Sequence, residues 1–105
     1  MTDGDIKQTF GQVRELAKTL TRTPDDERVL VYKSIDPLLL SLEGVLRHAR
    51  NAYASDKINE LKVHLIALAR LDESDGYSDE EHYEWALNAL QDLHASGAFG
   101  EPAGT

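Results

Sequence analysis

Acidic residues crowd around one glycine in the stretch from Asp72 to Trp85, which reads DESDGYSDEEHYEW. This composition is typical of the EF-hand calcium loop, which places oxygen ligands at positions 1, 3 and 5, a glycine at position 6 and a glutamate at position 12. With Gly76 at position 6, Leu71 falls at position 1 and His82 at position 12, so neither end supplies the required carboxylate. Starting the loop one residue later fails as well. The spacing therefore excludes an EF-hand.

Histidines near carboxylates are a second arrangement that could hold a metal. The chain has four histidines, His48, His64, His82 and His94. Glu60 lies four residues before His64, and Asp79 lies three residues before His82, so each pair would share one side of a helix. A di-iron carboxylate bundle needs paired Glu-x-x-His motifs, and the sequence contains none. We therefore expect no metal and no cofactor. A metal-binding helical bundle and an irregular cation site between Asp72 and Glu81 stay as alternatives.

Other catalytic chemistry finds little support in the residue types. The chain has no cysteine, which excludes disulfides, thiol catalysis and cysteine-ligated zinc. Its seven glycines are scattered and form no phosphate-binding loop or dinucleotide fingerprint. Serine, histidine and aspartate are present, but a catalytic triad is defined by geometry rather than by composition. We expect a protein that is not an enzyme.

Length and composition predict one soluble domain. The chain has 105 residues, of which 41% are hydrophobic and 29% charged. The first ten residues contain acids and no apolar run, so they do not resemble a secretory signal. The most apolar stretch, residues 35–46, is interrupted by charges and is shorter than the roughly 18 residues of a membrane span. We expect a cytoplasmic location and no membrane partner.

Charge is distributed unevenly along the chain. The net charge is −8, yet residues 1–70 hold 11 Lys and Arg against 10 Asp and Glu. Residues 71–105 hold nine acids and no Lys or Arg, so this part carries a balance of −9. An acidic region disfavours binding to phosphate backbones and favours a partner with a basic surface.

Hydrophobic periodicity predicts an all-α, compact single-domain bundle of four to five helices. The expected helices cover about 4–21, 24–33, 37–53, 56–71 and 79–95, with a domain at 1–97 and a flexible C-terminal tail at 98–105. Thr23 and Asp36 each precede a proline, which is typical of a helix start. Ser78 and Glu81 have the spacing of a capping box, which predicts where the last helix begins.

Trp85 points the wrong way for a core residue of that last helix. The expected buried stripe consists of Tyr83, Ala86, Leu87, Leu90, Leu93 and His94, and Trp85 lies about 160° from its centre at 100° per residue. Tryptophan is enriched at binding hot spots. We therefore predict a partner-binding surface formed by Trp85, Glu81, Glu84, Asn88 and Asp92. The competing interpretation is that the tail or the second helix covers Trp85.

Leu40 raises a similar question, because it lies away from the apolar face of its helix. It is predicted either to join the partner-binding residues, with self-association as one outcome, or to pack against the short second helix.

Together these patterns predict a small acidic protein-binding module, such as a regulator, adaptor, inhibitor or immunity or antitoxin-type protein. Its acidic last helix would engage a basic macromolecular partner, and in one version of this hypothesis would mimic the charge of nucleic acid. The alternative is direct nucleic-acid binding by a basic patch around Arg47, Arg50 and Lys57, with Asn51 and Lys62 nearby. The overall negative charge disfavours that alternative.

Overall fold

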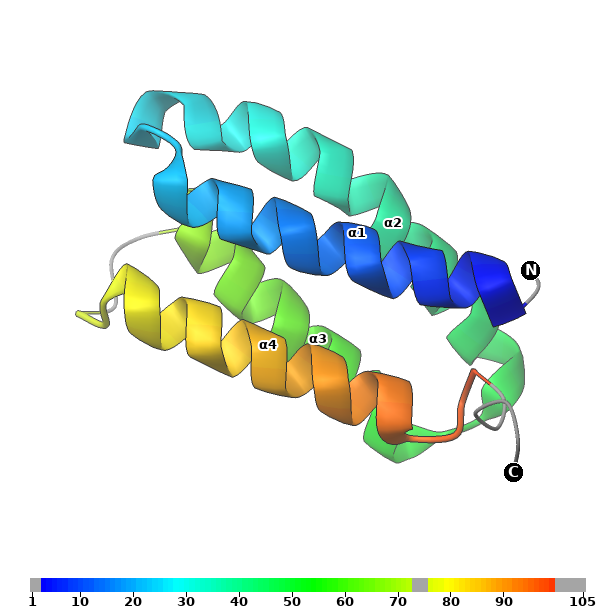
Figure 1. Cartoon of the computed structure of the whole chain (residues 1–105). Coiled ribbons are helices and arrows are strands. Elements are labelled where there is room, and N and C mark those ends of the chain that lie inside the picture. Colours follow the sequence, from blue (N-terminus) through cyan, green and yellow to red (C-terminus); the bar gives the residue numbers. More distant parts are fainter. Residues whose placement is uncertain (1–2, 73–75, 100–105) are drawn as a thin grey trace.

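The protein is an antiparallel bundle of four helices, seen here in a computed structural model that describes residues 3–72 and 76–99 (Figure 1). The elements are α1 (Asp3–Arg22), a short 3-10 helix η1 (Asp25–Glu27), α2 (Arg28–Ala49), α3 (Ala52–Leu68) and α4 (Asp79–Ala95). The bundle measures 41 × 22 × 22 Å. The predicted all-α class is confirmed, with four long helices rather than five. Within the described residues, no helix is long and apolar enough to cross a membrane.

The four helices occupy the corners of a square around one hydrophobic core. α1 packs against α2 and α4, and α3 packs against the same two helices, most extensively against α4. α2 and α4 lie on a diagonal, which the ion pair between Arg28 and Asp79 spans where the two helices begin. The helix predicted at about 4–21 forms α1, and its stripe of apolar residues at spacings of three and four is buried: Ile6, Phe10, Val13, Ala17 and Leu20.

The prediction of a break between residues 33 and 37 is wrong, because α2 continues through Pro37. A proline inside a helix removes one N–H, which leaves the carbonyl of Lys33 without its helical partner. Pro37 and Lys33 are both exposed, so water can satisfy that carbonyl. Thr23 does not cap a helix either, since its hydroxyl donates to the Thr19 carbonyl at the end of α1 (2.6 Å).

α3 begins one turn earlier than the sequence predicts. Arg50 takes a left-handed conformation (φ 50°), which ends α2 at Ala49, four residues before the predicted end. Asn51 then caps α3 by accepting a hydrogen bond from the Ala54 amide (3.0 Å). The predicted start at Ser55 and Asp56 is wrong because the Asn51 cap already satisfies the first turn.

α4 begins and ends where the sequence predicts. The Ser78 hydroxyl accepts from the Glu81 amide (3.1 Å), and the Glu81 carboxylate accepts from the Ser78 amide (3.4 Å), so the capping box is present. Beyond α4, Phe99 is only 7% exposed and its ring meets that of Phe10 edge-on, with centroids 5.2 Å apart. Of the predicted tail, Ala98 and Phe99 therefore pack on the core, and residues 100–105 lie outside the described part.

Candidate functional site

The buried side of α4 is rotated relative to the predicted stripe. The residues it buries are His82, Ala86, Ala89, Leu90 and Leu93. Of the predicted members, Tyr83 and Leu87 are only half-buried, and His94 is exposed although its ring stacks on Phe10. At 100° per residue the centre of the buried side moves by roughly 60°. Trp85 therefore lies at the edge of the buried side instead of opposite it.

Trp85 lies in a group of aromatic rings, which we call the Trp85 cluster: His64, Tyr77, His82 and Trp85. The Trp85 ring centroid is 5.0 Å from that of Tyr77, 5.3 Å from that of His64 and 5.7 Å from that of His82. The side chain stays 36% exposed. Within the described residues neither cover considered from sequence lies over Trp85, because Phe99 packs on Phe10 and α2 meets α4 only through the Arg28–Asp79 ion pair where the two helices begin.

The predicted partner-binding residues divide into three groups. Glu81, Glu84 and Asn88 each lie within about one turn of Trp85 on α4, and all four side chains are exposed to solvent. Asp92 is half-buried and forms an ion pair with Lys57 of α3 (3.6 Å). Leu40 is 54% exposed but lies on α2, the helix diagonal to α4, so the structure does not bring it to the others.

The basic residues near the α2–α3 junction are largely paired with acids. Lys57 contacts Glu60 (3.2 Å) in addition to Asp92. Lys62 contacts Glu43 (2.7 Å), and this hydrogen bond raises the pKa of its ammonium group. Arg47 and Arg50 are exposed. The candidate nucleic-acid surface therefore consists mainly of two arginines, and its lysines already serve ion pairs within the bundle.

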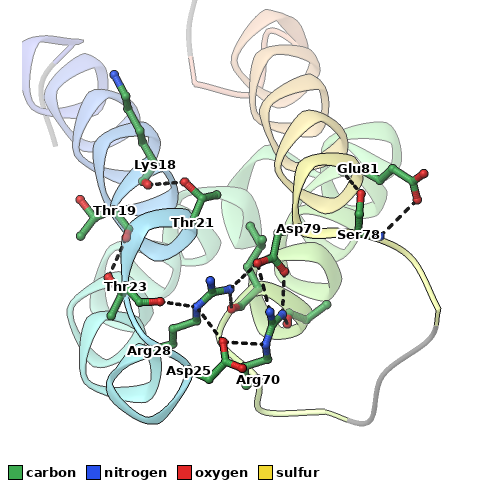
Figure 2. Close-up of polar contacts among 12 residues, drawn as sticks. Lys18, Thr19, Thr21, Thr23, Asp25, Arg28, Arg70, Ser78, Asp79 and Glu81 are labelled. Carbon is green, nitrogen blue, oxygen red and sulfur yellow. Dashed lines mark hydrogen bonds and ion pairs between the residues drawn. The ribbon is translucent and has the colours of Figure 1, made fainter.

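Sequence reasoning missed Arg28, whose guanidinium is buried where the ends of several helices meet (Figure 2). The residue is 5% exposed. Its Nε donates to the Thr23 carbonyl after α1 (2.8 Å), and its Nη1 donates to the Leu68 carbonyl at the end of α3 (2.9 Å). Nη1 also lies 3.0 Å from the Asp79 carboxylate at the start of α4. One side chain thus satisfies carbonyls that have lost their helical partners and joins three helix ends.

Arg70 completes this polar clasp, which consists of Asp25, Arg28, Arg70 and Asp79. Arg70 donates two hydrogen bonds to the Asp79 carboxylate (2.7 and 3.0 Å) and lies 3.3 Å from Asp25. The hydrogen bond from Arg70, followed by that from Arg28, lowers the pKa of Asp79 below its ordinary value. No motif in the sequence distinguishes these arginines from solvent-facing ones, because their partners lie far along the chain.

The two carboxylate–histidine pairs of the alternative metal-binding interpretation do not form metal sites. Asp79 belongs to the clasp, and Glu60 pairs with Lys57. Instead, His64 of α3 meets His82 of α4, with their Nδ1 atoms 3.1 Å apart. Within residues 3–72 and 76–99, no group of three or more His, Cys, Asp or Glu side chains is placed to hold a metal. The predicted irregular site after Asp72 includes residues 73–75, which lie outside the described part.

No protein-family model, curated protein or solved structure matches this chain.

Proposed function

We propose that this protein acts by binding another protein, and that the outer face of α4 is the binding surface. Trp85 is the observation that supports this most directly. Its ring is held on one side by the Trp85 cluster and open to solvent on the other. A ring fixed in this way loses little side-chain freedom on binding, and tryptophan offers a large apolar area with one N–H for orientation.

The charge around Trp85 defines the chemistry of the partner. Glu80 and Glu84 are exposed, and in the described part of the chain no Lys or Arg lies within ion-pair distance of either. A complementary surface would have an apolar pocket for Trp85 with Lys or Arg at its rim. The protein would then be a non-catalytic cytoplasmic regulator, adaptor or inhibitor, including the immunity or antitoxin type. If the partner itself binds nucleic acid, α4 would occupy its basic groove.

Affinity capture from native lysate tests this proposal. Trp85→Ala and the double variant Glu80→Lys/Glu84→Lys should each lose the captured partner. Glu81 is left unchanged because its carboxylate belongs to the capping box.

Two variants serve as matched controls. Leu30→Ala removes an exposed apolar side chain from α2, and Glu15→Lys/Asp36→Lys reverses two exposed acids outside α4. Both controls should retain the partner. Equal recovery of every captured protein by all variants would show that α4 is not the binding surface.

A further inference from the structure

Two imidazoles face each other between α3 and α4. The Nδ1 atoms of His64 and His82 are 3.1 Å apart, and the ring centroids are 5.3 Å apart with planes tilted by 44°. His82 is buried (3% exposed), whereas His64 is half-exposed. At this distance the two Nδ1 atoms can share one proton but cannot both carry one. At least one Nδ1 lone pair is therefore directed toward the other ring.

The separation also suits two ligands of one metal ion. Imidazole nitrogens bind zinc at about 2.0–2.1 Å, so two of them around one ion are roughly 2.9–3.4 Å apart at ligand–metal–ligand angles between square and tetrahedral. The observed 3.1 Å lies inside that range. An ion bound by both nitrogens would lie beside the line that joins them, with each lone pair directed about 40° away from that line.

We propose that His64 and His82 bind one divalent transition-metal ion of the type that imidazole prefers, such as Zn²⁺ or Ni²⁺, through their Nδ1 atoms. Within the described residues no third His, Cys, Asp or Glu side chain joins these two in a cluster. The half-exposed side of His64 is the path by which the ion enters.

The site has consequences for the fold and for pH. An ion held by both rings cross-links α3 to α4, so binding should stabilise the folded state. Metal binding to imidazole displaces protons, so the affinity should fall as the pH is lowered. The outer face of α4 plays no part in this argument, and the site stands or fails independently of the proposed function.

Trp85 supplies the reporter for a direct test, because its ring lies 5.3 and 5.7 Å from the two imidazoles and it is the only tryptophan. The protein, prepared without a polyhistidine tag, is titrated with Ni²⁺ near neutral pH while tryptophan fluorescence is recorded. Equilibrium dialysis gives the number of ions bound, and thermal unfolding is compared with and without Zn²⁺. We expect saturable quenching at one ion per chain and a higher Tm with Zn²⁺.

His64→Gln removes the half-exposed ligand and spares the buried one, and circular dichroism checks that this variant folds. Its affinity for Ni²⁺ should fall by about tenfold or more, and the Zn²⁺ shift in Tm should disappear. His48→Gln is the matched control, because His48 is an exposed histidine on α2, and this variant should bind as the wild type does. Quenching that does not saturate, or an affinity unchanged by His64→Gln in a folded variant, would overturn the proposal.

Discussion

Replacing Arg28 with methionine tests the clasp at one end of the bundle. Methionine keeps the length and apolar packing of the arginine stem but has no donors. The variant leaves the Leu68 carbonyl, which is buried, without the 2.9 Å hydrogen bond from Arg28. It also removes the contact between Arg28 and the Asp79 carboxylate.

The magnitude follows from these lost contacts. An unsatisfied buried carbonyl costs about 1–3 kcal/mol. Removing one partner of a buried ion pair costs about 3–5 kcal/mol when the remaining charge has no other partner. Asp79 keeps its two hydrogen bonds from Arg70, so this second contribution is much smaller. We expect Arg28→Met to lower the free energy of unfolding by about 2–4 kcal/mol, a large share of the 5–15 kcal/mol typical of small domains.

Urea unfolding followed by circular dichroism measures the effect, with Arg70→Met as the matched variant. Arg70 contacts the same carboxylate from a more exposed position, with its side chain 39% exposed. Its loss should cost only about 0–1 kcal/mol, as for other solvent-accessible ion pairs. If Arg28→Met costs no more than Arg70→Met, burial of the guanidinium does not control stability at this end of the bundle.

Three further predictions concern the clasp, the C-terminal segment and the α2–α3 junction. The pKa of Asp79 is lowered in the folded state, so its stabilising effect is present above the unfolded pKa of about 3.9 and is lost as the pH falls through the folded value. In urea unfolding at several pH values, the free energy of unfolding of Asp79→Asn should therefore decrease less steeply with falling pH than that of the wild type. Phe99→Ala should lower the free energy of unfolding by about 3 kcal/mol, because Phe99 is buried against Phe10, and an unchanged value would show that this end does not pack. Arg50→Gly should raise the free energy of unfolding by up to about 1 kcal/mol, because glycine adopts the left-handed conformation without strain. Arg47→Gly, inside α2, should lower it by about the same amount. A lower Tm for Arg50→Gly than for Arg47→Gly would contradict both expectations.

Structural features that depend on residues close together in the chain could be predicted from the sequence. The stripe of α1 and the Ser78–Glu81 capping box both depend on residues within a few turns of each other, and both are confirmed. Pro37 was misread because the same dipeptide can start a helix or lie on the exposed side of a longer one. The choice between these outcomes depends on which side of α2 faces solvent, and tertiary packing decides that.

The orientation of α4 at the candidate site also depends on tertiary packing and could not be predicted from the sequence. Periodicity predicts that an apolar stripe exists, but neighbouring helices fix its direction. α4 packs most extensively against α3, and the small side chains of Ala86 and Ala89 are buried. This packing carries His82 into the core and brings Trp85 against His64. Sequence reasoning therefore selected the tryptophan but could not find its ring neighbours, two of which form the proposed metal site.

The unpaired charge on the surface of α4 also differs from the formal charge counted from the sequence. Residues 71–105 carry a formal balance of −9, yet Asp79 is held by Arg28 and Arg70, and Asp92 is held by Lys57. Carboxylates already paired within the bundle contribute little to attraction at a distance, because each is accompanied by a neighbouring cation. Steering of a basic partner by α4 must then depend on its exposed glutamates. For this reason the salt dependence of binding should follow Glu80 and Glu84 and should be nearly insensitive to Asp92.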